Sequence, residues 1–408
     1  MKLKLIFNLL LLAALTACGP FGNVTLQTPG PAAASGTPFI IVQTPPPPTG
    51  TPVILLPTDT PIPPTSAPAS LVVVPEPQII SFHMTDALNG WAVGGSYILR
   101  TMDGGLTWYN VTPAELAQTG VNVTGRYFLN ASTAWLVNLG VDTAQGTLYR
   151  TADGGLTWSS AAVPFGGGEM KFLDGQRGYI LTSLGVAAGS QAVSIYQTAD
   201  GGATWTRIYT NAPGDPAAAD TLPFAGQKSG ITFLDDTHGW VGGNVPMPSN
   251  VYLYATQDGG ATWTQQSLAL PLGFESAMTE VDAPVFFTAL DGVLPVRLVA
   301  EPLSSVFYVT RDGGLTWTAT FPLNVTGRYW MANLLDLFLW DGGPSLYVSH
   351  DTGLTWDLVA TNVNVADTLM QFEFADASIG WMLTRDAAGH AAFYKTTDGG
   401  ATWNVLIP

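Results

Sequence analysis

The first copy of a sevenfold repeat reads Thr101-Met102-Asp103-Gly104-Gly105-Leu106-Thr107-Trp108. Its pattern is Thr/Ser-x-Asp-x-Gly-x-Thr-Trp, and we call each copy a box. Successive box aspartates stand 50, 47, 58, 54, 39 and 47 residues apart, and the sixth copy differs only in having Ser349 and Thr352. Repeats of about 20–50 residues are typical of solenoids and propellers. The box aspartates are Asp103, Asp153, Asp200, Asp258, Asp312, Asp351 and Asp398, and the box tryptophans are Trp108, Trp158, Trp205, Trp263, Trp317, Trp356 and Trp403.

A second, weaker motif precedes the boxes and reads Phe/Met-x-Asp-x-x-x-Gly-Trp, as in Phe233–Trp240 and Phe374–Trp381. Short apolar runs between the two motifs indicate strands bounded by turn residues. In each box the glycine tolerates a positive φ, and the aspartate accepts hydrogen bonds from the amides of its own turn. The tryptophan can bury a large ring against a neighbouring unit. Two hairpins in each repeat therefore predict a four-stranded blade.

We expect an all-β fold over residues 71–408, a seven-bladed β-propeller of four-stranded antiparallel blades. A closed ring of blades leaves only short, protected edges. The chain should begin on an inner strand near Gln78 and end on the outer strand Asn404–Ile407, and Leu71–Val74 is a candidate for an additional edge strand. We assign the box aspartates to turn stabilisation and the box tryptophans to the core, because seven equivalent carboxylates around a ring cannot form one active site.

The amino terminus has the features of a lipoprotein signal. Lys2 and Lys4 precede a short apolar stretch, too short for a comfortable membrane span, which predicts a signal peptide over residues 1–17. The ending Leu15-Thr16-Ala17-Cys18 resembles the lipobox of bacterial lipoproteins, which implies acylation at Cys18. Two or more acyl chains anchor a protein stably in a membrane. The predicted localisation is the bacterial cell envelope, outside the cytoplasmic membrane.

Residues 18–70 follow as a predicted disordered tether. Positions 19–70 hold 14 of the 30 prolines and a single charged residue, Asp59. Proline lacks the backbone donor of helices and sheets and favours extended polyproline II structure. The tether would hold the propeller away from the membrane.

Charge and composition exclude several functions. The net charge is −16, and since residues 1–70 contribute +1, the remainder carries −17. Nucleic-acid binding needs a basic footprint, so it is excluded. A single cysteine excludes an intrachain disulfide and a cysteine-based zinc site, and the four histidines are scattered. We expect no metal and no cofactor.

The box pattern resembles the Asp-box, or BNR repeat, found in sialidases, xyloglucanases, the sortilin luminal domain and the photosystem II stability/assembly factor family. The compact form with a Phe-x-Asp-x-x-x-Gly-Trp motif before each box is most similar to the last of these. That resemblance implies a propeller that binds a partner and assists assembly. We therefore expect a non-catalytic, surface-anchored binding or assembly module, although fold alone does not establish function.

The alternative is a glycoside hydrolase or sialidase-like enzyme acting on extracellular glycans. A sialidase needs three arginines that clamp a carboxylate, together with a Tyr/Glu nucleophile pair. The early Arg-Ile-Pro motif of that family is absent, and Arg100, Arg150 and Arg311 belong to the boxes or their neighbours. An enzyme should show a carboxylate pair or arginine triad in a deep pocket, whereas a binding module should show a broad face.

One hexapeptide lies outside the repeat pattern and occurs twice. Asn122-Val-Thr-Gly-Arg126-Tyr127 recurs as Asn324-Val-Thr-Gly-Arg328-Tyr329, each time before the first strand of a blade. One interpretation is an initial turn retained after duplication. The other is a pair of Arg/Tyr groups at the mouth of the central channel, where arginine can bind a carboxylate with two hydrogen bonds.

The predicted partner, a protein or a glycan, docks on the face opposite the box turns. Loops there vary, whereas the box turns are nearly identical, and variable loops on a rigid scaffold are where binding usually resides. We expect a preference for a cationic group, from the net charge, or for a carboxylate, from the two arginines. The variable segments are Asn138–Thr147, Leu184–Ala192, Tyr209–Lys228, Gly243–Asn250 and Arg385–His390.

Overall fold

The computed structural model describes residues 71–139, 145–341 and 343–407, so the predicted signal peptide, Cys18 and the tether lie outside the described residues. The described residues form antiparallel strands and one short helix, α1 (Ala114–Thr119). None of their helices is long and apolar enough to cross a membrane. The first three units are β1 (Val72–Val73), β2 (Ile79–Met84), β3 (Gly90–Gly94), β4 (Ile98–Thr101) and β5 (Tyr109–Asn110); β6 (Val123–Phe128), β7 (Ala134–Leu139), β8 (Gly146–Thr151) and β9 (Ser159–Val163); and β10 (Glu169–Phe172), β11 (Gly178–Ala187), β12 (Ser190–Thr198) and β13 (Thr206–Thr210).

The strands of the other units follow in the same order, inner strand first. The fourth and fifth units share one nine-stranded sheet, in which a single pair, Asn244 with Glu280, connects them. If this nine-stranded sheet is divided at that pair, the arrangement is compatible with the predicted seven blades. The strands are β14 (Gln227–Phe233), β15 (Gly239–Asn244), β16 (Leu253–Thr256) and β17 (Thr264–Gln265); β18 (Met278–Val281), β19 (Val285–Phe286), β20 (Gly292–Val299), β21 (Ser304–Thr310) and β22 (Thr318–Ala319); β23 (Arg328–Met331), β24 (Leu337–Trp340), β25 (Ser345–Ser349) and β26 (Asp357–Ala360); and β27 (Leu369–Phe374), β28 (Gly380–Arg385), β29 (Ala391–Thr396) and β30 (Asn404–Ile407).

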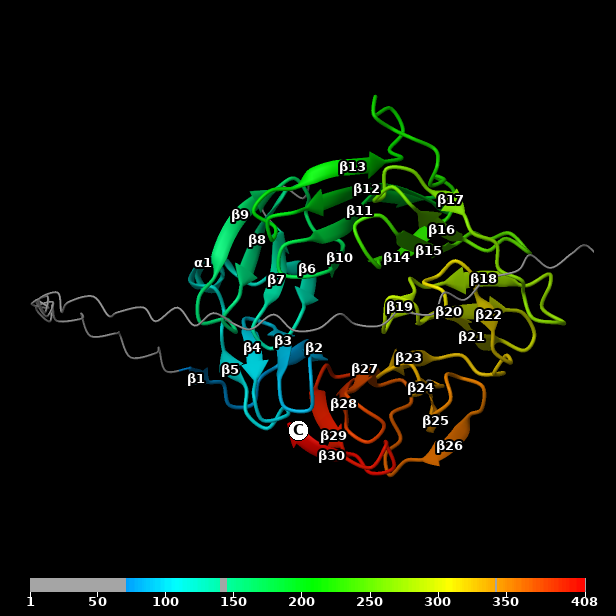
Figure 1. Cartoon of the computed structure of the whole chain (residues 1–408). Coiled ribbons are helices and arrows are strands. Elements are labelled where there is room, and N and C mark those ends of the chain that lie inside the picture. The colour runs from blue at the N-terminus through cyan, green and yellow to red at the C-terminus, as the bar shows by residue number, and fades with distance from the viewer. Residues whose placement is uncertain (1–70, 140–144, 342, 408) are drawn as a thin grey trace, which may run out of the picture. The chain divides into compact units, whose positions relative to one another are not determined.

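The sheets stand around a common axis with their inner strands toward the middle (Figure 1), and the predicted all-β propeller fold is confirmed. Hydrophobic clusters fill the spaces between successive sheets; for example, Trp135 of the second unit stacks on Phe172 of the third with ring centroids 3.7 Å apart. Aromatic side chains of this size contribute most of the buried apolar area in such a core.

Side-chain packing closes the ring. Phe82 of the first unit meets Phe393 of the last edge-to-face at 5.0 Å, and the Trp381 indole donates to the Gly104 carbonyl oxygen at 2.8 Å. Among the described residues, β30 pairs only with β29, so no pairing between the first and last units closes the ring. Val72–Val73 instead pairs with β5 as an additional outer strand, as predicted for this segment.

Each box forms the turn between the third and fourth strands of its unit. In the first box, Thr107 N–H donates to Asp103 Oδ1 at 2.9 Å, and Gly105 N–H donates to Thr101 Oγ1 at 2.9 Å. Gly105 has φ of 93°, which favours glycine. Burial alone would raise the pKa of Asp103, but the hydrogen bonds from Thr107 and Thr101 hold it below its ordinary value. The ionised aspartate therefore orders this turn.

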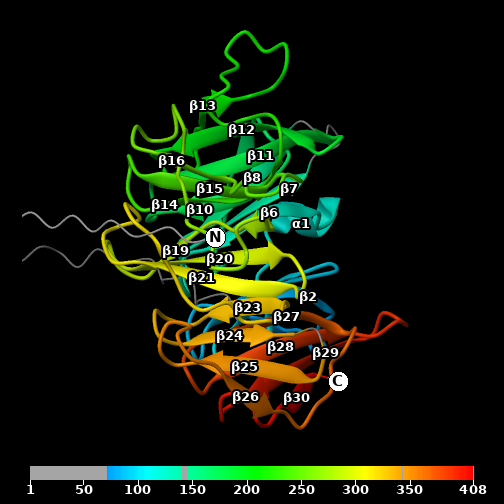
Figure 2. The ribbon, with the colours of Figure 1, turned by 90° about the vertical axis from the view of Figure 1, so that its right-hand side faces the viewer.

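The box turns share one face with the ends of the inner strands. Gly104 N–H in the first box donates to the carbonyl oxygen of Leu88, which lies in the turn between β2 and β3. The inner strands consequently begin on the opposite face. Hairpins such as β11–β12 and the connection from β13 to β14 also belong to that opposite side of the strands, and this connection projects from the ring in Figures 1 and 2.

Candidate binding site around the central axis

The first hexapeptide forms most of β6. Arg126 is exposed and Tyr127 is half-buried. The Tyr127 ring packs toward the third unit, with its centroid 5.9 Å from that of Phe172, and Lys171 Nζ lies 5.7 Å from the Tyr127 centroid. Tyr127 is therefore next to a positive charge.

The second hexapeptide lies differently along its strand. The last residue of β6, Phe128, pairs with the first residue of β7, and its counterpart in the sixth unit is Met331, which pairs with Leu337. Tyr127 stands one residue before this pair, but Tyr329 stands two residues before it. Successive side chains of a strand point to opposite faces, so a shift of one residue reverses the direction of every side chain.

Contacts of Tyr329 agree with that reversal. Its hydroxyl donates to Oδ2 of Asp282 in the fifth, preceding unit at 2.6 Å. Burial and the Asp282 carboxylate raise the pKa of Tyr329 well above its ordinary value. Tyr329 thus remains a neutral hydroxyl that donates to a carboxylate, whereas Tyr127 faces a lysine.

The two arginines point toward the first and seventh units from opposite sides. Arg126 shares its side of β6 with Phe128, whose ring stacks with His83 of the first unit at 6.2 Å. Arg328 shares its side of β23 with Trp330, whose indole donates to the Phe374 carbonyl oxygen of the seventh unit at 2.7 Å. Because side chains alternate along each strand, Arg126 points toward the first unit and Arg328 points toward the seventh, which are neighbours in the ring.

A histidine–glutamate pair connects those two units. Glu373 on β27 is 2% exposed and accepts hydrogen bonds from Met84 N–H at 2.9 Å and Gln371 Nε2 at 2.8 Å. His83 Nδ1 lies 3.3 Å from Glu373 Oε2. Burial would lower the pKa of His83, but the Glu373 carboxylate raises it above its ordinary value, against opposing effects of Arg126 and Lys171. Arg126 is thus close enough to His83 to influence its charge.

Sequence reasoning missed His83, Lys171, Glu373 and Asp282. The first three share one signal, because each stands directly before the aromatic or methionine residue that opens the second motif. Tyr127 occupies the same position in the second unit. Asp282 has no such signal, since the motif is degenerate in the fifth unit.

The box residues remain at the turns and in the spaces between units. Trp108, Trp263 and Trp403 are at most 3% exposed, while the other four box tryptophans are half-buried. Within the ranges that the structure describes, no group of three or more His, Cys, Asp or Glu residues could hold a metal ion.

The predicted variable face contains one firmly anchored segment. Lys228 is 8% exposed, and its ammonium group donates to the carbonyl oxygens of Pro223 at 2.6 Å, Gly226 at 3.0 Å and Gln191 at 3.1 Å. Burial lowers the pKa of Lys228 to about 8. The long connection before β14 is therefore held at its base. Of the segment Asn138–Thr147, residues 140–144 lie outside the described residues.

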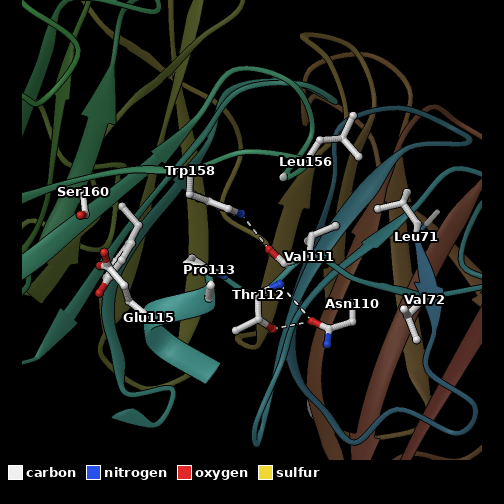
Figure 3. Close-up of a pocket in the computed structure, with 13 residues that line it drawn as sticks. Leu71, Val72, Asn110, Val111, Thr112, Pro113, Glu115, Leu156, Trp158 and Ser160 are labelled. Atoms are coloured by element: carbon white, nitrogen blue, oxygen red, sulfur yellow. Dashed lines mark hydrogen bonds between the residues drawn. The ribbon is translucent and has the colours of Figure 1, made fainter. Parts of the chain in front are cut away.

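A groove of about 370 Å³ lies at the periphery, between the outer strands of the first two units (Figure 3). The Trp158 indole donates to the Val111 carbonyl oxygen at 2.8 Å across it, and Leu71 and Leu156 add apolar surface. Glu115 is the one charged residue among those that line the groove. This arrangement offers no pair of acid and base groups.

Comparisons with known proteins found likeness only among solved structures. No family model matches the chain, and no curated protein matches it. A structure described as YCF48 bound to D1 peptide has 17% identity, a TM-score of 0.49, and coverage of 82% of this chain and 95% of that one. YCF48 from Cyanidioschyzon merolae has 18% identity, a TM-score of 0.46, and coverage of 81% and 97%. A GH74 xyloglucanase from Xanthomonas campestris has 10% identity, a TM-score of 0.38, and coverage of 82% and 46%.

Proposed function

We propose that the protein is a non-catalytic binding or assembly module, anchored to the bacterial cell envelope through Cys18 and carrying its binding site on the propeller. Its partner, a protein or a glycan, presents a carboxylate to Arg126 and Arg328. The partner approaches from the face opposite the box turns, where the inner strands begin.

Cys18→Ala would test the anchor, because the variant should lose its acyl chains and its partition into detergent.

The placement of Arg126 is the observation that supports this function most strongly. In four other units the equivalent position, two residues before the end of the inner strand, holds a buried apolar residue. These residues are Phe82, Met170, Ile231 and Phe372, each 8% exposed or less. Arg126 is instead exposed, and no hydrogen bond from its side chain is found among the described residues. A guanidinium without a partner can form two parallel hydrogen bonds to a carboxylate.

A pair of matched probes tests the proposal. Short acetylated peptides with a free terminal carboxylate are compared with the same peptides as carboxamides, and sialyllactose is compared with lactose, on the full chain. In at least one of these two pairs, the probe with the carboxylate should bind more tightly than its uncharged counterpart. The double variant Arg126→Ala with Arg328→Ala should remove this preference for the carboxylate. Arg311→Ala is the control, because this exposed arginine pairs with Asp291 near the box turns and its loss changes the net charge equally. Unchanged preference in the folded double variant would refute the proposal.

The glycoside-hydrolase alternative has one observation in its favour, since Glu280, Asp282 and Tyr329 line one cavity. Its volume of about 120 Å³ is below the ~300–1,000 Å³ of ordinary small-molecule sites. The raised pKa of Tyr329 makes that hydroxyl a poor nucleophile, and Arg297 already pairs with Glu280 at 2.7 Å. Release of reducing sugar from xyloglucan or arabinan by the wild type, and not by Asp282→Asn, would favour this alternative.

A further inference from the structure

A small cavity lies between the fifth and sixth units because the inner strand of the fifth unit is interrupted. Strands β18 and β19 both pair with β20, but the three residues 282–284 between them stand opposite only two, Leu294 and Pro295. Pro284 and Pro295 have no backbone N–H and cannot complete the ladder. The one bond that remains there is from Asp282 N–H to the Pro295 carbonyl oxygen, at 3.1 Å. The gap in the pairing leaves about 120 Å³.

The backbone that carries Asp282 is held in place by close packing. A Cβ atom on Gly242 of the fourth unit would come within 2.6 Å of the Val281 carbonyl oxygen, so only glycine allows this approach. On the other side, the Tyr329 hydroxyl reaches Asp282 Oδ2. The carboxylate is therefore positioned by two neighbouring units and cannot swing toward solvent without losing its hydrogen bond.

The charges that line the cavity do not cancel. Arg297 Nη1 lies 2.7 Å from Glu280 Oε2, which leaves the Asp282 carboxylate as the uncompensated charge. Oδ2 accepts from Tyr329, and Oδ1 has no hydrogen-bond partner among the described residues. Burial raises the pKa of Asp282 above its ordinary value, although Tyr329 and Arg297 act in the opposite direction. A half-buried carboxylate with one free oxygen favours a cation that can donate a hydrogen bond.

We propose that this cavity binds a primary alkylammonium group, with Asp282 as its acceptor. The apolar walls of Pro295, Val296 and Phe307 suit the methylene groups of the ligand. The volume accommodates the end of an alkyl chain and excludes a sugar ring or a large aromatic group.

Two sources can supply this chemistry, a lysine side chain of a protein or a free alkylamine. Arg328 is adjacent to Tyr329 on β23 but points to the other side of the strand, and the cavity requires a cation where the two arginines require an anion. It therefore does not depend on the proposed carboxylate-binding function, and either can fail without the other.

Calorimetric titration of the full chain with four probes tests the site. Butylammonium and Nα-acetyl-lysine N-methylamide carry the ammonium group, while 1-butanol and Nα-acetyl-norleucine N-methylamide are their uncharged counterparts. The charged probes should bind, and Asp282→Asn should weaken them at least about tenfold, as expected for loss of a hydrogen bond between charged groups. Binding of both charged probes supports a site open to free amines, and binding of the lysine derivative alone supports a protein source.

Asp357→Asn is the matched control, since Asp357 is exposed on the outer strand β26 and its loss changes the net charge equally. Equal weakening in both variants would overturn the proposal, because it would show only attraction by overall charge. Equal affinity for butylammonium and 1-butanol would also overturn it, as would the absence of binding by either ammonium probe.

A measurement on the wild type alone keeps the test valid if Asp282→Asn does not fold. Butylammonium stays charged at all pH values of interest, so a loss of affinity reports on the protein. The ionisable groups that face Asp282 are Tyr329, Glu280 and Arg297. Affinity should fall as the pH drops through the raised pKa of Asp282, and a constant affinity from pH 7 to pH 4 would contradict the site.

Discussion

The two copies of one hexapeptide occupy opposite electrostatic environments. In the second unit, Tyr127 lies beside Lys171, and Arg126 is near His83. In the sixth unit, Tyr329 donates to Asp282, and the same sequence has moved one residue along its strand. Identical residues therefore line the ring with opposite orientation, and local sequence alone does not fix what a side chain contacts.

The shift comes from one additional residue, Trp330, which separates Tyr329 from the last paired residue of its strand, and the backbone around the glycine of each copy differs as well. Gly125 is inside β6, next to an irregularity in the pairing between Val123 and Gly125. Gly327 precedes β23, and its backbone lies against the carbonyl group of Trp340. The inner strand of the first copy contains a bulge that the inner strands of the first, fourth and seventh units also have, whereas in the second copy the paired strand begins only at Arg328.

Replacing the glycine of each copy should give the largest difference in stability between the two copies. A Cβ atom on Gly327 would coincide with the Trp340 carbonyl oxygen, so Gly327→Ala must displace backbone. A Cβ atom on Gly125 would lie 3.1 Å from the Gly168 carbonyl oxygen, which a small adjustment relieves. We expect Gly327→Ala to lower the free energy of unfolding by about 3 kcal/mol and Gly125→Ala by about 1 kcal/mol. Urea unfolding measures both, and equal losses would contradict the different backbone placement.

Removing the two tyrosine hydroxyls should have the next largest effect. Tyr329→Phe leaves the half-buried Asp282 carboxylate without its donor and should cost about 1–3 kcal/mol at pH 7. No hydrogen bond from the Tyr127 hydroxyl is found among the described residues, so Tyr127→Phe should cost less than about 0.5 kcal/mol.

The cost of Tyr329→Phe should depend on pH in a defined direction. Because the pKa of Asp282 is raised in the folded protein, its ionised form opposes folding above that pKa, and the penalty disappears as the pH falls through it. Tyr329→Phe increases the penalty of the ionised form. The stability difference from wild type should therefore shrink on acidification, and a difference that grows would show that Asp282 is not the group affected.

The sequence predicted the propeller because each box contains its own turn chemistry. The Thr101 hydroxyl donates to Asp103 and accepts from Gly105 N–H within five residues, so their arrangement follows from local sequence. The pair of arginines was predicted from a repeated motif, but the copies point to opposite sides because one additional residue, Trp330, separates Tyr329 from the end of its strand. Asp282 and Tyr329 are 47 residues apart and belong to neighbouring units, so no local sequence pattern predicts the hydrogen bond between them.

His83 should stabilise the region between the two arginines in a pH-dependent way. Glu373 raises its pKa in the folded protein, so the stabilisation is fully present below the ordinary pKa of histidine and is lost as the pH rises through the folded value. His83→Gln keeps a hydrogen-bond donor without the charge. Its stability loss should be larger at pH 5.5 than at pH 8.5 by less than about 1 kcal/mol, because the His83 side chain is 35% exposed and solvent screens part of the attraction. Thermal unfolding at both pH values measures this, and a larger loss at the higher pH would contradict the pairing with Glu373.

The smallest expected effect, a change in the pKa of His83, discriminates best between the two copies. Arg126 and Lys171 both oppose protonation of His83, while Arg328 is not among the groups that shift its pKa. Arg126→Met and Lys171→Met should therefore each raise the pKa of His83 slightly, because a nearby positive charge is removed. Arg328→Met removes the same charge from the other copy and should leave that pKa unchanged. Titration of the imidazole signals by NMR, assigned with His83→Gln, measures all three variants. Equal shifts from Arg126→Met and Arg328→Met would mean that both guanidinium groups stand equally near His83, and the one-residue difference in register would then not determine where the arginines point.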